Sequence, residues 1–325
     1  MKVIIPVAGK GTRTRPHTLY TSKPLLFVAG KKVIEHILDS LVPFKDVIEE
    51  VIFIIGENQR DFKEYITSCN KFSFPLNYAI QPLPLGLGDA VARGLKEDTK
   101  DVLILLGDTI AKFKKNYIGK ESFIGVMEVE NPKRFGIVEI KNGFIINMEE
   151  KPENPKTNLA IAGVYYIKDS KVLYQTINTV IKKGIKTKGE IQLTDALRLM
   201  CENGYRFKPV LLEEWYDCGT LSALLKTNRK LLLKNFTLKN NLYDSFVIPP
   251  VWIHPSARIE ESIIGPFVSI DKNCLIKRCN IRDSIINQGS EIVNCVFYNS
   301  ISGINSKIKA NPWIFNLGPF SNFEF

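Results

Sequence analysis

The spacing of hydrophobic positions changes along the chain and predicts where strands and helices lie. Short apolar runs bounded by glycine or polar residues predict strands that are buried on both faces. Apolar residues that recur three and four positions apart predict helices with one buried face. On these patterns, strands are expected at 3–7, 51–56, 76–81 and 102–106, and helices at 32–41, 59–66, 90–95 and 221–233.

Strands and helices alternate through the first part of the chain, and this order predicts an α/β fold. The near-continuous apolar strands indicate a doubly wound, mostly parallel, Rossmann-like sheet. Further strands are expected at 123–129, 136–140 and 162–167. Ligands bind such sheets outside the carboxyl ends of the strands. The loop after the first strand, Gln81 and Asp108 each lie at such an end, so we expect them to meet at one site.

The pattern changes near Val251, where isoleucine begins to recur every five or six residues. This spacing fits neither a strand nor a helix face. It predicts a short left-handed parallel β-helix, in which one aliphatic residue per hexapeptide stacks inside a prism; a β-sandwich is the alternative. The isoleucines are Ile253, Ile259, Ile264, Ile270, Ile276, Ile281, Ile286 and Ile292. We therefore expect an α/β domain over 1–235, a linker over 236–250 and a β-helix with an aromatic tail over 251–325.

Length, composition and charge narrow the class of protein. A chain of 325 residues is long for one core, and 45% hydrophobic with 24% charged residues is ordinary for a globular protein. No apolar run reaches the ~18–20 residues that span a bilayer, and no signal-peptide pattern precedes the first strand, so a cytoplasmic protein without a membrane partner is expected. The six cysteines form no C-x-x-C pair, which argues against zinc and for reduced thiols. The net charge of +10 comes mainly from dispersed lysines, which are typical of a solvated surface and compatible with anionic substrates. No arginine-rich cluster with interleaved aromatic residues indicates a nucleic-acid partner.

The stretch Ala8-Gly9-Lys10-Gly11-Thr12-Arg13 directly follows the first predicted strand. Glycines let the backbone turn tightly and present bare N–H groups, which suits a phosphate or a base edge. Arg13, Arg15 and Lys23 add cations, so a nucleotide phosphate site is expected. The loop is neither a P-loop nor a dinucleotide-binding loop, because Lys10 precedes the second glycine and Pro16 stops a helix from following it.

The pattern G-x-G-T-R, followed by Pro16 and then by Ser22-Lys23-Pro24-Leu25, resembles the sugar-1-phosphate nucleotidyltransferases, or nucleoside-diphosphate-sugar pyrophosphorylases. Gly107-Asp108-Thr109 and Asp217-Cys218-Gly219-Thr220 resemble the contexts of that family's two metal-binding aspartates. The resemblance therefore implies Mg²⁺ bound by Asp108 and Asp217. Two carboxylates suffice for Mg²⁺ when substrate phosphate oxygens complete its coordination.

The reaction that the resemblance implies is an in-line displacement between two substrates, an NTP and a sugar 1-phosphate. A phosphate oxygen of the sugar 1-phosphate attacks the α-phosphorus of the NTP, and pyrophosphate leaves. The nucleophile is already ionised, so no protein base or covalent residue is needed, and positioning and charge neutralisation carry catalysis. By resemblance, Arg13 neutralises the triphosphate, Lys23 bridges the reacting phosphates, Lys151 holds the sugar phosphate and Glu150 binds a sugar hydroxyl.

The resemblance also assigns the two sides of the expected site. Gln81 offers a donor and an acceptor to the O4/N3 edge of uracil or thymine. The nucleotide side comprises Ala8, Gly9, Gly11, Thr12, Arg13, Gln81, Gly86 and Asp108. The sugar-phosphate side comprises Gly136, Glu150, Lys151, Asn158 and Gly163. The motifs resemble both uridylyl- and thymidylyltransferases, which leaves UTP and dTTP open; glucose 1-phosphate is the expected sugar substrate.

Two rival interpretations stay open. The first is a catalytically silent regulatory or scaffolding subunit of such an enzyme. The second concerns the β-helix, which in some relatives transfers acyl groups with a histidine, whereas His254 is the only histidine of that region. A role in trimerisation, subunit contacts or allostery is therefore favoured, and a homo-oligomer formed through the β-helix is expected. The aromatic tail, with Trp313, Phe315, Phe320, Phe323 and Phe325, is expected to bury against another subunit or the first domain.

Overall fold

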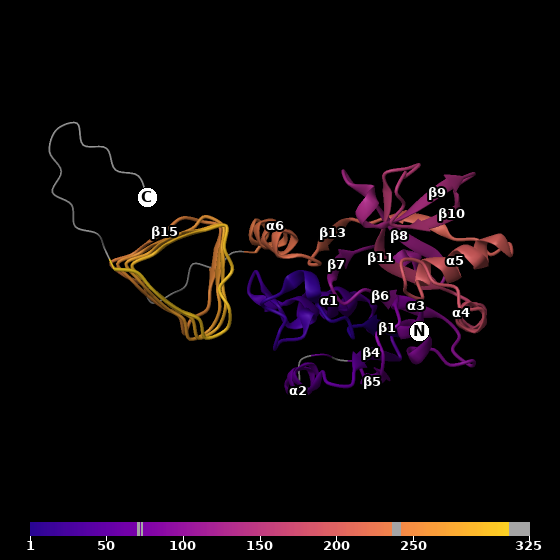
Figure 1. Ribbon diagram of the computed structural model, residues 1–325, viewed down its shortest axis with the longest axis horizontal. Helices are drawn as coiled ribbons and strands as arrows, with labels where there is room; N and C mark the ends of the chain where they lie inside the picture. Colours follow the sequence, from indigo (N-terminus) through magenta and orange to yellow (C-terminus); the bar gives the residue numbers. More distant parts are fainter. Residues whose placement is uncertain (70–71, 73, 236–241, 312–325) are drawn as a thin grey trace. The chain divides into compact units, whose positions relative to one another are not determined.

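The structure is a computed structural model that describes residues 1–69, 72, 74–235 and 242–311. The chain divides into two compact units (Figure 1). The first contains Met1–Leu26 and Lys31–Leu224, and the second contains Phe27–Gly30 and the chain from Leu225 onward. The domain limits at 235 and 250 stay a prediction, and the aromatic tail lies outside the described residues.

A nine-stranded mixed sheet forms the centre of the first unit, in the order β10-β9-β11-β6-β1-β4-β5, with β8 and β12 joined beside β11. Strands β6, β1, β4 and β5 run parallel, as their apolar sequences predict, and antiparallel pairing begins at β11. The strands are β1 (Lys2–Pro6), β4 (Glu50–Gly56), β5 (Leu76–Gln81), β6 (Val102–Leu105), β8 (Phe123–Glu128), β9 (Gly136–Lys141), β10 (Phe144–Glu150), β11 (Leu159–Ile167) and β12 (Lys208–Leu211).

Helices cover both faces of this sheet. One face buries Ile4, Ile54 and Ile104 in a core shared with α3, α4 and α5. On β4 the side chain of Phe53 points the other way and meets Phe62 of α2, with ring centroids 5.2 Å apart. Helices α1 (Val33–Leu41), α2 (Arg60–Ser68), α3 (Leu87–Gly94), α4 (Ser170–Lys182), α5 (Leu193–Glu202) and α6 (Leu221–Leu232) complete the set in the described part of the chain.

Two short strands outside the main sheet were not expected from the sequence. Strand β7 (Thr109–Lys112) follows β6, and β13 (Glu214–Asp217) pairs with it in antiparallel fashion. Strands β2 (Phe27–Val28) and β3 (Lys31–Lys32) are shorter still. Helix α4 and strand β10 also lie in stretches for which we predicted no element.

Three parallel sheets make up the β-helix of the second unit, and their strands trace superposed triangular turns in Figure 1. The first face carries β14 (Leu242–Tyr243), β17 (Arg258–Glu260), β20 (Leu275–Lys277), β23 (Glu291–Val293) and β25 (Lys307–Lys309). The second carries β15 (Phe246–Val247), β18 (Ile263–Ile264), β21 (Asn280–Arg282) and β24 (Val296–Tyr298). The third carries β16 (Val251–Ile253), β19 (Val268–Ile270) and β22 (Ile285–Ile286). Strands β14 and β15 lie within the stretch expected to be a linker.

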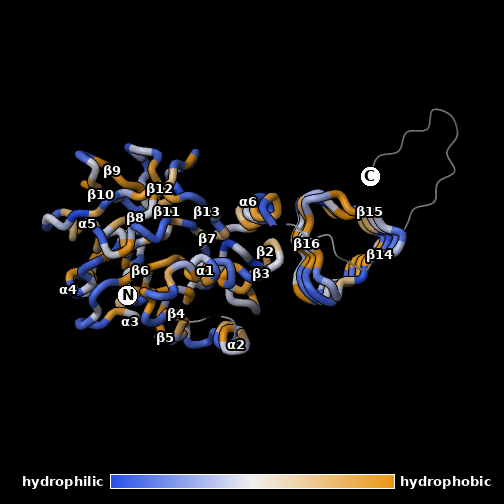
Figure 2. Tube along the Cα trace, turned by 180° about the vertical axis from the view of Figure 1, so that it is seen from behind, coloured by the Kyte–Doolittle hydropathy of each residue, from blue (hydrophilic) through white to orange (hydrophobic). Residues whose placement is uncertain are grey.

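Isoleucines fill the prism. Ile259, Ile276 and Ile292 occupy equivalent positions of β17, β20 and β23 and are fully buried. Figure 2 shows how hydrophobic and hydrophilic segments alternate around the turns. The predicted fold class, an α/β sheet followed by a parallel β-helix, is confirmed. All pairs in these three sheets are parallel, so the β-sandwich alternative is wrong.

The coils of the β-helix are shorter than three whole hexapeptides. Lys277 lies 17 residues after Glu260, its partner on the preceding coil, whereas Asn294 lies 16 residues after Arg278. Small residues turn the corners: at one of them the backbone N–H of Ser262 donates to Ser245 Oγ, and that of Cys279 donates to Ser262 Oγ, both at 3.0 Å. Side chains thus replace backbone partners where the strands end.

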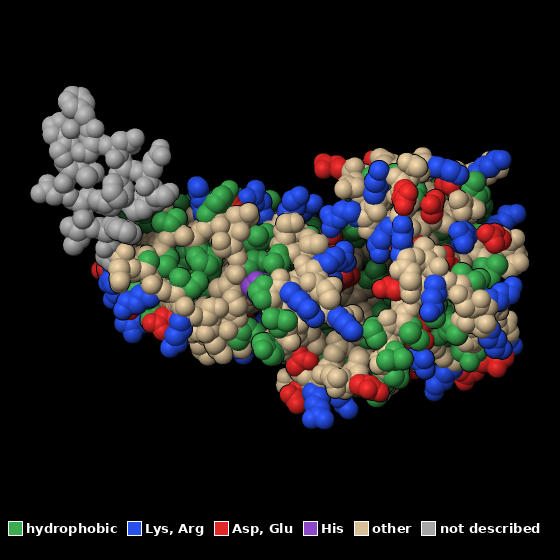
Figure 3. Space-filling model, in the orientation of Figure 1, with side chains coloured by type: hydrophobic (Ala, Val, Ile, Leu, Met, Phe, Trp, Pro, Cys, Tyr) green, Lys and Arg blue, Asp and Glu red, His purple; other side chains and the backbone are tan. Residues whose placement is uncertain are grey.

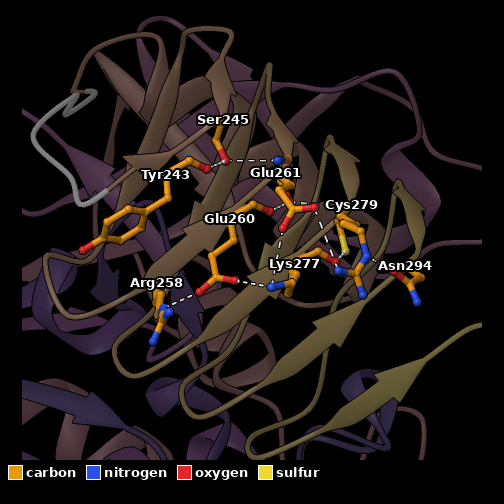
Figure 4. A network of polar contacts seen from close by, with 10 residues as sticks. Tyr243, Ser245, Arg258, Glu260, Glu261, Lys277, Cys279 and Asn294 are labelled. Atoms are coloured by element: carbon orange, nitrogen blue, oxygen red, sulfur yellow. Dashed lines mark hydrogen bonds and ion pairs between the residues drawn. The ribbon is translucent and has the colours of Figure 1, made fainter.

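The three outer faces of the prism differ in chemistry. On the first face, charged side chains pair with one another, since Glu260 binds both Arg258 and Lys277 (Figure 4). The second face exposes a column of side chains in which Phe246 is 75% and Val296 is 81% exposed, and polar Asn280 interrupts this otherwise apolar column. The third face carries Trp252 and Ser269, which contact other segments of the same unit.

Candidate active site

A cavity of about 640 Å³ opens in the first unit at the carboxyl ends of β1, β5 and β6, and Figure 3 shows this hollow with basic side chains around it. It is lined by every residue that the sequence and the resemblance placed at the site except Arg15 and Asn158. Asn158 is exposed, and its backbone carbonyl accepts a hydrogen bond from the N–H of Val129 at 3.0 Å. The structure therefore brings the predicted segments together but leaves Asn158 outside.

The glycine loop after β1 is held in shape by its own hydrogen bonds. Gly11 adopts the left-handed backbone conformation with φ of 60°, which few other residues tolerate. Its carbonyl accepts hydrogen bonds from the hydroxyls of Thr14 at 2.8 Å and Thr18 at 2.6 Å. Only one 3₁₀ turn, Thr12–Thr14, follows before Pro16. The loop therefore forms no helix, as its proline predicted.

Lys23 and Asp108 form the central ion pair of the site. The Lys23 ammonium group contacts Asp108 Oδ2, and the two side chains are 12% and 28% exposed. Burial on its own would raise the pKa of Asp108, but the charges of Lys23 and Arg13 outweigh it and hold that pKa below its ordinary value. Asp108 is therefore a carboxylate at neutral pH.

The β7–β13 ribbon places Asp217 beside Asp108. Asp217 pairs with Thr109 across the ribbon, and the backbone N–H of Cys218 donates to the carbonyl of Asp108 at 2.9 Å. Asp217 Oδ1 accepts from the backbone N–H of Gly219 at 2.6 Å, and its Oδ2 lies 3.7 Å from Arg134 Nη2. Two neighbouring carboxylates form an oxygen donor set that fits Mg²⁺ when substrate phosphates supply the other ligands.

The described residues contain no group of three or more histidine, cysteine, aspartate or glutamate side chains arranged to hold a metal ion. A closed site built from protein ligands alone is therefore absent from this part of the chain. The pair Asp108 and Asp217 fits a metal ion that binds together with a phosphate-bearing substrate.

Gln81, at the end of β5, has one fixed amide orientation. Its Nε2 group donates to the carbonyl of Gly86 at 3.0 Å and to Asp89 Oδ2 at 2.8 Å. Both partners are acceptors, so a flipped amide would place its own oxygen against the oxygens of Gly86 and Asp89. The donor that we expected Gln81 to offer to a base is thus engaged within the protein. Its amide oxygen remains the group with which it can accept a hydrogen bond from a ligand.

The loop that bears Gly86 is bound to the segment before α5. The backbone N–H of Gly88 donates to the carbonyl of Ile191, and the N–H of Ile191 donates to that of Leu85, both at 2.8 Å. Gly86 has φ of 127°, and a Cβ atom there would come within 2.4 Å of the carbonyl oxygen of Ile191. This close backbone approach requires glycine.

The sugar-phosphate side of the cavity is formed around Glu150 at the end of β10. Glu150 Oε2 accepts from the hydroxyl of Thr194 at 2.9 Å, and Oε1 lies 3.1 Å from Lys151 Nζ. A Cβ atom on Gly136 would lie 3.0 Å from Glu150 Oε2, so glycine there keeps the carboxylate in place. Tyr165 lines the same cavity, and burial, followed by the charges of Glu150 and Asp108, raises its pKa.

Several residues that line the cavity were not among the predicted site residues. They include Arg134 and Trp215, whose ring meets that of Phe135 edge to face at 5.4 Å, as well as Glu190 and Gln192. The indole Nε1 of Trp215 is buried and has no hydrogen-bond partner among the described residues. Trp215 stands two residues before Asp217, and Arg134 two residues before Gly136, so proximity to predicted residues was the one available signal.

No helix in the described part of the chain is both long enough and apolar enough to cross a membrane.

Comparison with known proteins finds relatives in sequence and solved structures of similar fold. Glucose-1-phosphate thymidylyltransferase of Streptomyces griseus is 26% identical over 325 aligned residues, which cover 90% of this chain and 88% of that protein. The bifunctional protein GlmU of Methanococcus maripaludis is 32% identical over 238 residues; the match covers 72% of this chain but only 55% of GlmU.

The solved structure is that of a protein from Bacillus anthracis in complex with sucrose, provisionally named a glucose-1-phosphate thymidylyltransferase. It superposes with a TM-score of 0.61 at 28% identity, and the match covers 73% of this chain and 98% of that one. A sequence model of the nucleotidyl transferase family matches residues 2–234. The glycine loop, together with Asp108 and Asp217, thus indicated the correct family, and the chain belongs to the nucleotidyl transferases.

Proposed function

We propose that this protein transfers a nucleotidyl group from UTP or dTTP to glucose 1-phosphate and releases pyrophosphate. The observation that carries the proposal is the composition of one cavity. Its walls hold a glycine loop with Arg13, the Lys23–Asp108 pair beside Asp217, and Lys151 with Glu150. One group of residues combines the cations Arg13 and Lys23 with the carboxylates Asp108 and Asp217, and the other combines Lys151 with Glu150. These two groups suit two phosphate-bearing substrates.

The proposed chemistry needs no protein base. A sugar phosphate dianion attacks the α-phosphorus, so the residues act by holding charge and orientation. Arg13 and Lys23 neutralise the triphosphate, and Lys151 holds the attacking phosphate while Glu150 accepts from a sugar hydroxyl. Asp108 and Asp217 would hold Mg²⁺, which when bound supplies further neutralisation of the phosphate oxygens.

The preference for uracil or thymine rests on the orientation of Gln81. Its amide oxygen accepts a hydrogen bond, and N3–H of uracil and thymine is a donor at the corresponding edge. Cytosine and adenine present acceptor nitrogens at that edge, so they would meet this oxygen unfavourably. Names of relatives point the same way, since a thymidylyltransferase is among them.

The proposal is tested by pyrophosphate release with Mg²⁺, with each NTP assayed against a panel of sugar 1-phosphates. Release that requires both UTP or dTTP and glucose 1-phosphate is the expected result. A different best pair would reassign the substrates. If folded protein releases no pyrophosphate with any pair of substrates, the result would favour the regulatory or scaffolding subunit instead.

We also propose that copies of the chain associate through the β-helix. Support comes from its second face, where Phe246, Ile263 and Val296 are exposed in one column that Asn280 interrupts between Ile263 and Val296. The first face carries charges already paired with one another, and the third is used within the unit. An exposed apolar stripe of this kind is typical of an interface.

A further inference from the structure

Two segments connect the candidate active site directly to the second unit. The loop Phe27–Gly30 begins four residues after Lys23, and helix α6 begins four residues after Asp217. This loop, and α6 from Leu225 onward, belong to the compact unit that contains the β-helix. The chain therefore leaves the candidate catalytic pair at two points and enters the same unit both times.

Asn228 of α6 joins these segments through its carboxamide. It is 1% exposed. Its Oδ1 accepts two hydrogen bonds, from the backbone N–H of Ala29 at 2.9 Å and from the hydroxyl of Ser269 on β19 at 2.6 Å. Its Nδ2 donates to the backbone carbonyl of Phe267 at 3.2 Å. One side chain thus links the loop after Lys23, the helix after Asp217 and a coil of the β-helix.

Packing around this link leaves little room for the loop to move alone. The ring of Phe27 meets Trp252 of β16 edge to face, with centroids 5.5 Å apart. A Cβ atom on Gly30 would lie 2.6 Å from the same indole, so the backbone lies directly against it. The loop is therefore fixed to the third face of the prism by an aromatic contact and by Asn228.

No other residue reproduces the bonding of Asn228. Alanine removes all three hydrogen bonds and leaves a buried N–H, hydroxyl and carbonyl unpaired, which is costly in a dry environment. Aspartate retains the acceptor for Ala29 but places a charge against the carbonyl of Phe267. The requirement for both an acceptor and a donor in one short side chain is specific to asparagine.

We infer that Asn228 is a positioning residue through which the β-helix orients Lys23 and Asp217 for phosphate transfer. The inference rests on the proposed function. The segments that carry Lys23 and Asp217 continue into the loop and the helix that Asn228 links. If the hydrogen bonds of Asn228 are lost, movement of the loop or the helix shifts these two side chains, because only a few residues of chain lie between. Misplacement of a reacting group by about 1 Å costs on the order of 10²-fold in rate. Glu150 and Lys151 lie on β10 and the turn after it, and neither of these continues along the chain into a linked segment.

The test compares Asn228→Ala with the wild type in the full-length protein. We expect kcat to fall about 10- to 100-fold, while the KM for sugar 1-phosphate changes less than about twofold. Hydrogen exchange of the peptide that spans 22–30, measured without metal or substrate, should quicken because Ala29 loses its partner. Replacement of a purely structural residue would change the rate of hydrogen exchange and the stability, but it would not lower kcat while leaving KM nearly unchanged.

Arg229→Ala is the matched control. The neighbouring Arg229 also joins α6 to the β-helix, through Asp283, but it makes no described contact with 27–30. Its removal should leave kcat within about twofold of the wild type. Wild-type kcat in Asn228→Ala, or an equal loss in Arg229→Ala, would overturn the inference.

If Asn228→Ala does not fold, Ser269→Ala is the milder variant. It removes one of the two donors to Asn228 Oδ1 and should shift kcat and exchange in the same direction by a smaller factor; no shift in either would also overturn the inference. A wild-type protein that releases no pyrophosphate would refute the proposed function, whereas the exchange measurement would still report on the link.

Discussion

Two of the three cations that we propose to bind phosphate are held by a carboxylate. Lys23 contacts Asp108, and Lys151 contacts Glu150 at 3.1 Å. Pairing of this kind limits the freedom of a long side chain and fixes where its charge lies. Replacement of either carboxylate therefore removes a proposed ligand and also releases the cation next to it.

Asp108→Asn and Asp217→Asn should each lower Mg²⁺-dependent turnover by at least about 10²-fold, because each removes charge from the proposed metal pair. Pyrophosphate release across a Mg²⁺ titration measures the effect. Asp39→Asn is a control of the same chemistry, since Asp39 forms an exposed pair with Lys31. Near-normal activity in either site variant would contradict the metal assignment.

The lowered pKa of Asp108 predicts a specific dependence of stability on pH. Its carboxylate stabilises the folded state at pH values above the unfolded pKa of about 3.9, and this contribution is lost as the pH falls towards the lower folded pKa. Urea unfolding of the wild type should therefore weaken more between pH 5 and 3 than that of Asp108→Asn. Parallel pH profiles would show that the Lys23 contact does not stabilise the fold.

Gln81→Ala should reduce discrimination among bases. Removal of the fixed amide oxygen should lower kcat/KM for UTP and dTTP about 10-fold or more while CTP and ATP change little, because only a matched donor loses its acceptor. Relative rates with the four nucleotides give the readout, and the KM for glucose 1-phosphate serves as an internal control. Unchanged ratios would remove Gln81 from base recognition.

At the scale of elements, the site depends on short segments that meet from distant parts of the sequence. The ribbon of β7 and β13 brings Asp108 to Asp217, and the loop 85–88 reaches the base side only because it is bonded to Ile191. These contacts join backbone atoms, and the one at loop 85–88 also requires glycine at position 86.

Gly86→Ala should displace this loop, because its Cβ would approach the carbonyl oxygen of Ile191 to 2.4 Å at a φ of 127°. We expect a rise in the KM for the NTP of about 10-fold or more and a loss of stability of about 1–3 kcal/mol. Gly9→Ala is the comparison for stability, since a Cβ at Gly9 meets nothing within 4 Å. Equal melting temperatures for the two variants would contradict the steric argument.

The elements that the sequence predicted best are those whose own residues determine them. The strand at 76–81 and the helix start at Leu221 match the structure, because hydrophobic spacing and capping are local properties. The β7–β13 ribbon was missed since its pairing joins residues far apart in sequence. Likewise, motif spacing brought Gln81 to the site, but only tertiary contacts with Asp89 and Gly86 show which end of its amide is available.

At the scale of the whole molecule, the three faces of the β-helix predict how the protein associates. Phe246→Glu combined with Val296→Glu places charges on the exposed apolar face and should lower the mass measured by light scattering to that of a single chain. Lys307→Glu is a control on the first face, where Lys307 is 80% exposed at its side chain. An unchanged mass in the double variant would exclude this face as the interface.

Coil length sets how the prism can grow. A coil contacts only the coils above and below it, so duplication of a whole coil of 16 or 17 residues preserves every inward isoleucine and every corner. Insertion of a single hexapeptide would instead move all three sheets out of register. The β-helix is therefore free to gain or lose length in whole-coil steps of about 4.8 Å. Added coils would change the height of its second face while the hydrogen bonds of Asn228 stay as they are.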